Sequence, residues 1–283
     1  MVANGFLDPN QLGDIRQRST TDTGIYLTHL IRTGWLKQCY TSIITFDIAQ
    51  FFPSLNHHFL SICLKKIGLS TNVRDFFNSY HSGHSISYLW NSFSSPMFDT
   101  NVGVGQGLAL SSILSAIYLS LIIKTFKKRI KNLKENILTD ILSFVDNGLL
   151  ISQEKSYFLF SFFLLCSYNI MSKILLDAGL IMEYSKTKLF YFTRVQHPLN
   201  SSIDLTPIGG PVIFPKPILY YLGFYFDCKL NFHFHTHFYA TKCLSTLNTM
   251  KMLGNSSCSL LSIQKHLLYR TCILPIVLYR FQL

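Results

Sequence analysis

Apolar positions along the chain fall into short runs typical of strands and longer runs typical of helices. Residues 1–40 are mixed and polar. Residues 41–46 are rich in β-branched and aromatic side chains and predict a buried strand that ends at Asp47. Asn56 predicts the N-cap of a helix that Gly68 terminates, and a second short helix is expected at 72–80.

Two hairpins are predicted in the middle of the chain. Residues 84–102 are expected to form paired strands around a turn at 94–96, where two serines precede a proline. Residues 141–152 contain two apolar runs on either side of Asn147-Gly148. Asn-Gly is the strongest local hairpin signal, because both turn positions require a positive φ. Asp146 is therefore expected at a hairpin tip.

The longest helical patterns cover residues 110–133 and 154–178, and Gly179 ends the second. Five of the nine prolines lie between 198 and 217, which predicts an exposed loop. The remaining predicted elements are strands at 189–193 and 218–227 and helices at 238–253 and 260–278. This order predicts an α+β fold, with an antiparallel sheet, helices on one of its faces and a helical appendage.

The composition is basic and poor in acids. Of 283 residues only 14% are charged, and 25 Lys and Arg against 14 Asp and Glu give a net charge of +11. Such low charge at 48% hydrophobic content excludes a disordered chain. The positive charge favours a polyanionic partner, either nucleic acid or an anionic membrane surface.

Residues 103–123 form an uncharged run that is long enough to span a bilayer. Gln106 and four serines interrupt it, so a buried helix is the favoured interpretation and an integral membrane protein is a remote alternative. The first residues lack the basic start and apolar core of a signal peptide. No membrane partner is expected.

Cysteine and histidine spacing argues against a structural metal or a disulfide framework. The chain has seven cysteines and no C-x-x-C pair, which favours a reducing, intracellular compartment. His233, His235 and His237 would share one face only in a strand, and a helix continuing into residues 238–253 would scatter them.

Two aspartates occupy unusual positions for an acid-poor chain. Asp47 and Asp146 each follow an apolar strand, where a carboxylate is costly unless it is paired, hydrogen-bonded or bound to metal. Together they could hold Mg²⁺ for phosphoryl or nucleotidyl transfer. The alternatives are a helix N-terminal acid for Asp47 and an ordinary turn residue for Asp146.

A glycine-rich string, Gly103-Val104-Gly105-Gln106-Gly107, precedes the first long helix. Glycines allow a backbone to approach a ligand closely, and a helix N-terminus attracts phosphate. The string lacks the Gly-Lys-Ser/Thr of a phosphate loop, so on its own it is weak support for a nucleotide site.

Taken in order, these segments resemble the palm motifs of reverse transcriptases. The matching strings are F-D-I-A-Q-F-F-P-S at 46–54, G-V-G-Q-G-L-A-L-S at 103–111 and F-V-D-N at 144–147. Further segments at 16–22, 179–188 and 221–227 resemble the fingers segment, the Gly-Leu…Lys-Thr-Glu motif and the primer-grip hairpin. Among reverse transcriptases, these strings most resemble those of the LINE-like retrotransposons, which lack long terminal repeats.

The resemblance implies a right-hand polymerase fold and a role for each matching residue. Asp47 and Asp146 would bind two Mg²⁺ ions, or Mn²⁺ in their place, with help from the backbone carbonyl of Ile48; Asn147 occupies the adjoining catalytic position. Phe52 would exclude a ribose 2′-hydroxyl. The other implied residues are Gln106, Gly107, Lys186 and Arg18 for the nucleotide, and Tyr221, Leu222 and Gly223 for the primer end.

Four residues depart from the family pattern. Asn147 replaces a second Asp, Gly105 a Pro, Leu108 a small Ser and Lys188 a Glu. The predicted metal site therefore has two carboxylates instead of three, which predicts weaker Mg²⁺ binding and impaired activity. A truncated or decayed copy of a longer element is the corresponding hypothesis.

The resemblance thus predicts one truncated reverse transcriptase domain over 1–283, with partial fingers at 1–40, a palm with inserted fingers elements at 41–227 and the start of a thumb at 228–283. It would act on an RNA template, a DNA primer and deoxynucleoside triphosphates, in the nucleus if active. The alternative is a catalytically dead palm that only binds nucleic acid, for which the basic run at 124–134 is the main indication.

Overall fold

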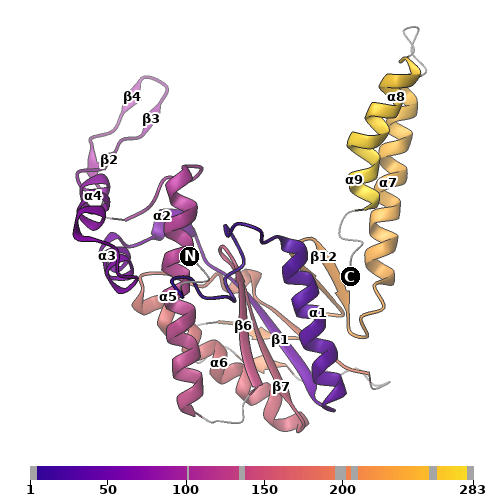
Figure 1. The fold of residues 1–283 in the computed structure, drawn as a ribbon, viewed down its shortest axis with the longest axis horizontal. Coiled ribbons are helices and arrows are strands. Elements are labelled where there is room, and N and C mark those ends of the chain that lie inside the picture. The colour runs from indigo at the N-terminus through magenta and orange to yellow at the C-terminus, as the bar shows by residue number, and fades with distance from the viewer. Residues whose placement is uncertain are drawn as a thin grey trace.

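A computed structural model describes residues 5–100, 102–133, 138–194, 202–204, 210–254 and 260–278. Its centre is a four-stranded antiparallel sheet in the order β6-β7-β1-β8 (Figure 1). These strands are β1 (Tyr40–Asp47), β6 (Leu138–Phe144), β7 (Asn147–Glu154) and β8 (Lys188–Phe192). The predicted strands at 41–46 and 189–193 and the predicted antiparallel sheet are confirmed.

Helices account for most of the remaining chain. They are α1 (Thr20–Leu36), α2 (Phe51–Ser54), α3 (His57–Lys66), α4 (Thr71–His81), α5 (Ala109–Leu133), α6 (Tyr157–Asp177), α7 (His233–Gly254), α8 (Ser262–Leu268) and α9 (Leu274–Val277), with a 3-10 turn η1 (Tyr184–Lys186) and a π-helical turn η3 (Tyr269–Ile273). The predicted cap is present, because the Asn56 side chain accepts a hydrogen bond from the Phe59 amide. Gly68 and Gly179 follow their helices with φ of +82° and +81°.

Both faces of the sheet are covered, which corrects the expectation of helices on one face. Ile44 belongs to a core shared with α5 and α6, whereas the neighbouring Ile43 belongs to a core shared with α1. The amphipathic signal of α1 is weak because small residues face the sheet. Gly24 is one of them, and a Cβ there would lie 2.7 Å from the Phe224 ring.

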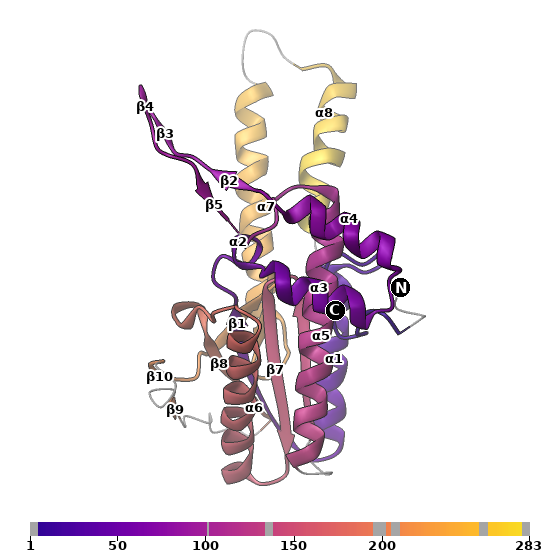
Figure 2. The ribbon, with the colours of Figure 1, turned by 90° about the vertical axis from the view of Figure 1, so that its left-hand side faces the viewer.

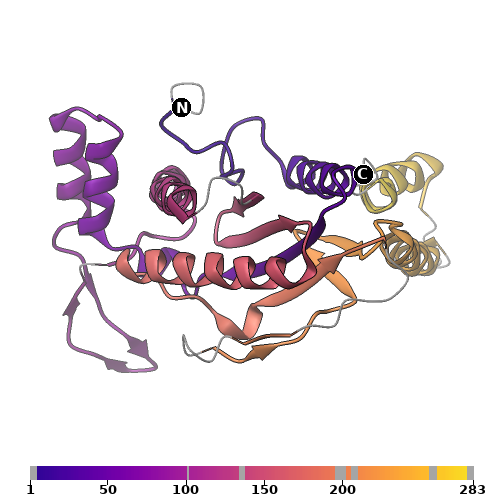
Figure 3. The same ribbon diagram turned by 90° about the horizontal axis from the view of Figure 1, so that it is seen from below.

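The second face is completed by the hairpin of β11 (Ile218–Tyr221) and β12 (Phe224–Asp227). From β12 the chain enters α7, which stands with α8 and α9 at one end of the molecule, while α3 and α4 lie at the other end (Figure 3). Because α7 begins at His233, it scatters the three histidines as expected: His235 is buried and His233 and His237 are exposed.

The long apolar helix α5 is a core element. Its segment Leu110–Asn132 is long and apolar enough to cross a membrane, but 61% of the most hydrophobic window is buried within the fold. Figure 2 shows α5 and α6 running alongside the sheet, and residues of both helices share one core with it. The preference for a buried helix agrees with this packing.

The hairpin between α4 and α5 has a different turn from the predicted one. Its strand pairs are nested: β2 (Ser85–Ile86) with β5 (Phe98–Asp99), and β3 (Leu89–Trp90) with β4 (Phe93–Ser94). The turn therefore falls at Asn91-Ser92, not at 94–96, and Asn91 adopts a φ of +54°. Asparagine tolerates this left-handed conformation better than the serines and proline of the expected turn.

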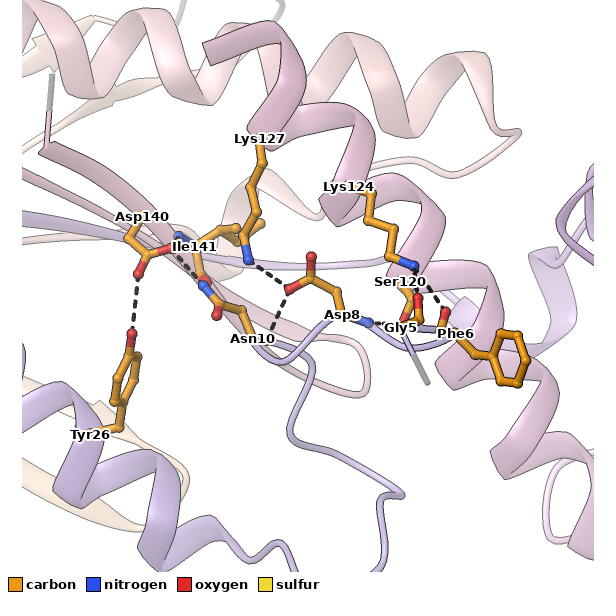
Figure 4. Close-up of polar contacts among 10 residues, drawn as sticks. All are labelled: Gly5, Phe6, Asp8, Asn10, Tyr26, Ser120, Lys124, Lys127, Asp140 and Ile141. Atoms are coloured by element: carbon orange, nitrogen blue, oxygen red, sulfur yellow. Dashed lines mark hydrogen bonds and ion pairs between the residues drawn. The ribbon is translucent and has the colours of Figure 1, made fainter. Parts of the chain in front are cut away.

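An N-terminal segment, residues 5–12, is attached to α5 and to β6 (Figure 4). The Lys127 ammonium lies 2.6 Å from the buried Asp8 carboxylate, and Lys124 donates to the carbonyls of Gly5 and Phe6. The two cations hold the N-terminal segment, so the basic run is not simply a free surface for nucleic acid.

Asn10 extends the same attachment to the sheet. Its side-chain amide donates to the Asp140 carboxylate at 2.6 Å and to the Ile141 carbonyl at 2.7 Å. The Leu12 amide donates to the Ser143 carbonyl at 2.9 Å, and the Ser143 amide donates to the Asn10 carbonyl at 3.0 Å, which adds the segment to the free edge of β6. Three parts of the sequence predictions fall outside the described residues: Lys134, most of the proline-rich segment and the loop after Gly254. Within the proline-rich segment the structure describes two short paired strands, β9 (Ile203–Asp204) and β10 (Val212–Ile213).

Candidate functional site

Asp47 is the last residue of β1, a strand held between β7 and β8 and buried along its interior. One carboxylate oxygen, Oδ2, lies 2.6 Å from the Lys186 ammonium. The other, Oδ1, is buried and has no hydrogen-bond partner among the described residues. A buried carboxylate oxygen without a partner is costly, so this atom is suited to a cation that the protein chain itself does not supply.

The β6–β7 hairpin brings the second carboxylate to the same edge, through a turn that differs from the prediction. The turn residues are Val145 and Asp146, while Asn147 and Gly148 belong to β7 and pair with Asp47 and Phe46. Val145 has a φ of +56°, which is unusual for a β-branched residue. The expectation that Asn147-Gly148 forms the turn was therefore wrong.

Gly148 has a packing role instead of a turn role. A Cβ at this position would overlap the ring of Phe46 on the neighbouring strand. The glycine thus allows Phe46 to lie flat across β7 directly before Asp47. Register within the sheet has taken precedence over the local Asn-Gly signal.

The electrostatics of the site come from its closely placed acids. Burial raises the pKa of the Asp146 carboxyl, and the negative charge of Asp47 raises it further. The Asn147 amide donates to Asp146 Oδ1 at 3.0 Å, which partly opposes that rise. Asn147 therefore presents a neutral hydrogen-bond donor at the position where the family pattern has a third carboxylate.

Asp14 is a neighbour of the site that its sequence position did not reveal. Gly13 lies so close to the turn that a Cβ would come within 2.5 Å of the Val145 amide nitrogen. Burial raises the pKa of Asp14, and the charge of Asp146 adds to this effect. The only sequence signal available was the scarcity of acids, which makes each of the fourteen worth examining.

Lys186 lies in η1. Just before this turn, the Glu183 amide donates a hydrogen bond of 2.9 Å to the Asp47 carbonyl, which ties the segment to the end of β1. Its hydrogen bond to Asp47 raises the pKa of the ammonium, and the Asp47 charge adds to that effect. The side chain is 63% exposed, so it is free to exchange Asp47 for a ligand anion.

The β11–β12 turn closes the site from the other side. The buried Tyr221 hydroxyl donates to the Asn147 carbonyl at 3.3 Å. Leu222 and Gly223 form the turn with φ of +49° and +83°, and the Gly223 carbonyl accepts a hydrogen bond from Tyr239 in α7. Burial raises the pKa of Tyr221, so its hydroxyl stays a neutral donor.

These elements enclose a cleft of about 270 Å³. Five of the predicted site residues line it: Asp47, Asn147, Lys186, Tyr221 and Leu222. Asp146 does not line the cleft, but it lies close enough to Asp47 for the two charges to interact. Residues that are distant in sequence, from four separate segments, thus meet at one edge of the sheet.

The other predicted residues lie outside this cleft. Phe52 is half-buried in α2, and its carbonyl accepts from Val104 at 2.9 Å, which ties the glycine-rich string to the segment after Asp47. Gln106 and Gly107 are exposed in the turn before α5. Ile48 is buried, and Arg18 lies exposed before α1; the proposed roles of these residues stay predictions.

The carboxylates of Asp47 and Asp146 fit a divalent cation. Among the described residues no group of three or more His, Cys, Asp or Glu side chains could hold a metal ion. The site offers the carboxylates of Asp47 and Asp146. Asp47 has a buried oxygen without a hydrogen-bond partner among the described residues, and its charge raises the pKa of Asp146. Two carboxylates supplemented by substrate phosphates are a common Mg²⁺ environment.

The family described as "Reverse transcriptase (RNA-dependent DNA polymerase)" matches residues 2–253. The chain belongs to the reverse transcriptase family. The domain has the mixed helix and antiparallel sheet content of the right-hand polymerase fold. No curated protein sequence matches the chain.

Solved structures similar to this reverse transcriptase domain include telomerases from Candida tropicalis. An apo form truncated from the C-terminal domain has 16% identity and a TM-score of 0.52, covering 74% of this chain and 39% of the telomerase. A complex with the TWJ fragment of telomeric RNA has the same identity and TM-score, covering 76% and 34%. At this identity the likeness concerns the fold, and the chain spans little more than a third of these telomerases.

Proposed function

We propose that this domain joins deoxynucleotides to a primer 3′-hydroxyl on an RNA template, as the polymerase core of a LINE-like retrotransposon. The observation that supports this most is the unpaired buried oxygen of Asp47 beside Asp146 at the edge of the sheet. The LINE-like assignment rests on the motif strings at 46–54, 103–111 and 144–147.

In this proposal Asp47 and Asp146 would hold two Mg²⁺ ions, and the chemistry supplied there would be neutralisation of the triphosphate charge and a lower pKa for the primer hydroxyl. Lys186 would leave Asp47 for the triphosphate, and its ammonium would protonate the departing pyrophosphate. Tyr221 fixes the β11–β12 turn against Asn147, so that Leu222 and Gly223 hold the primer end. Phe52, Gln106, Gly107 and Arg18 keep their proposed roles around the nucleotide.

The division into fingers at 1–40, palm at 41–227 and thumb at 228–283 belongs to the same proposal. It agrees with the position of the central sheet and with the helices α7 to α9 that follow Asp227. The six free cysteines of the described residues suit the proposed reducing, intracellular location.

Primer extension on an RNA template tests this function. Asp47→Ala should lower incorporation by at least about a hundredfold, because it removes a group that acts on the transition-state charge. Asp75→Ala, an exposed acid on α4, is the matched control and should retain wild-type activity. Extension that survives Asp47→Ala would contradict the site assignment.

Impairment by Asn147 is tested in the same assay. Asn147→Asp restores the third carboxylate of the family pattern and should raise both activity and Mg²⁺ affinity above those of the wild type. Equal activity in the two proteins would show that Asn147 does not limit catalysis.

A further inference from the structure

The charge balance of the cleft is unusual for a site that is expected to bind Mg²⁺. Three charged side chains line it: Asp47, Lys186 and Lys188. Asp47 and Lys186 pair with each other, whereas Lys188 has no ion pair among the described residues. The cleft lining therefore has an excess of one positive charge, and its unpaired cation is Lys188, where the family pattern has a Glu.

Lys188 is held in position by the sheet. It is the first residue of β8 and lies opposite Thr45 of β1. The Lys188 amide donates to the Thr45 hydroxyl at 3.2 Å, which fixes the backbone at this point. Opposed residues on antiparallel strands share a face, and Asp47 is two residues beyond Thr45, so Lys188 and Asp47 face the same side.

Tyr220 supplies an aromatic surface on the same cleft. It is 49% exposed, because its neighbours Leu219 and Tyr221 take the inward positions of β11. Its ring centroid lies 4.8 Å from that of Tyr225, the directly opposed residue of β12. Tyr220 thus packs against one neighbouring ring at an interplanar angle of 43° and keeps about half of its surface exposed, which makes it a candidate platform for stacking a base.

We propose that this cleft binds one nucleotide unit without a divalent metal, with its phosphate on Lys188 and its base on Tyr220. The inference deepens the proposed function, since it concerns the same cleft, but it assigns binding to this chain's own cation and not to Mg²⁺. The cleft volume of about 270 Å³ is slightly smaller than the range of about 300–1,000 Å³ for pockets that bind drug-sized ligands. The cleft is therefore expected to take a single nucleotide unit and not several. The phosphate belongs either to a strand end or to a free nucleoside triphosphate.

Binding of a short labelled oligonucleotide in EDTA tests this proposal. The probe is a 5′-fluorescein DNA hexamer with a free 3′-hydroxyl, and fluorescence anisotropy is measured over a salt series. One phosphate contact to single-stranded nucleic acid contributes about 0.7 to the slope of log affinity against log salt. Lys188→Gln should lower the slope by that amount, and Lys188→Arg should retain it.

Lys155→Gln is the matched control. Lys155 is an exposed lysine just after Glu154, at the end of β7 away from the cleft-lining Asn147, so the same charge is removed at a site remote from the cleft. Its slope should equal that of the wild type. An unchanged slope in Lys188→Gln, or binding that needs Mg²⁺, would overturn the proposal.

Three further variants distinguish base stacking and metal-dependent binding from a simple effect of charge. Tyr220→Phe should bind as the wild type, whereas Tyr220→Leu should lose at least about fivefold in affinity. Asp47→Asn should abolish primer extension yet tighten the hexamer in EDTA, because it releases Lys186 and removes a negative charge. Weaker binding by Asp47→Asn would contradict metal-free recognition while leaving the polymerase assignment intact.

Competition identifies the source of the phosphate. Displacement of the hexamer by unlabelled hexamer but not by a deoxynucleoside triphosphate assigns the cleft to a strand end. Displacement by the triphosphate at matched phosphate concentration assigns it to the free nucleotide. If neither competitor displaces the probe from the wild-type protein, the probe binds outside this cleft. That result would overturn the proposal.

Discussion

Asp14 and Asp146 form an acidic pair at the tip of the central hairpin. Both carboxyl groups have raised pKa values, each chiefly because of burial. For Asp14, the folded protein retains the proton to a higher pH than the unfolded chain does. Folded stability therefore falls as pH rises from the ordinary value of 3.8 through the raised pKa of the folded state.

Asp14→Asn should remove this loss. At pH 7 the variant should be more stable than the wild type by at most about 1 kcal/mol, since the carboxylate is only partly buried and solvent screens its charge. The difference should shrink as pH is lowered toward 3.8. Urea unfolding at pH 7 and pH 5 measures it, with Asp75→Asn as a control that should show no such trend. Lower stability of Asp14→Asn at pH 7 would mean that Asp14 binds a favourable partner.

Gly148 gives a second prediction for a single residue. Gly148→Ala should destabilise the domain by about 1–3 kcal/mol, the usual cost of overpacking, because its methyl group would overlap the Phe46 ring. The midpoint of urea denaturation measures the loss. In a double-mutant cycle with Phe46→Leu the two losses should not add, because the smaller side chain makes room for the methyl group. Additive losses would show that the ring does not limit this position.

The N-terminal segment and α5 provide a prediction for a pair of elements. Lys127→Met should cost about 1–3 kcal/mol, because it leaves the Asp8 carboxylate, whose side chain is only 5% exposed, without its cation. Lys128→Met, at the next and exposed position of the same helix, should change stability by less than about 0.5 kcal/mol. Equal effects of the two substitutions on thermal unfolding would argue against a specific attachment.

Elements with strong local signals could be predicted from the sequence, and those fixed by distant contacts could not. Asn56, Gly68 and Gly179 marked helix ends correctly, because caps act through nearby backbone groups. The turn at Val145-Asp146 was misplaced, because sheet register assigns Asn147 and Gly148 to β7. The helix α1 gave no clear signal, since small residues line its buried face.

At the scale of the whole molecule, the site could be predicted only in part. Asp47, Asn147, Lys186, Tyr221 and Leu222 were identified from motif resemblance, and the fold brings these five to one cleft. Asp14, Tyr220 and the cleft position of Lys188 depend on how separate segments cross in space, which no local pattern encodes.

The net charge of +11 is distributed so that part of it serves the fold itself. Lys124 donates to two carbonyls of the N-terminal segment, so Lys124→Gln should leave the salt dependence of nucleic-acid binding unchanged. Anisotropy of a labelled RNA over a salt series checks this. A decrease of about 0.7 in slope would show instead that Lys124 contacts a phosphate.

The contact between Phe46 and Gly148 has a consequence for comparing relatives of this domain. Any side chain at 148 enters the space of the ring at 46, so the two positions are not free to vary independently. In a set of aligned relatives we expect larger residues at 148 to occur with smaller ones at 46. Such paired variation would reveal the β1–β7 register, and with it the meeting of the two halves of the site, from sequences alone.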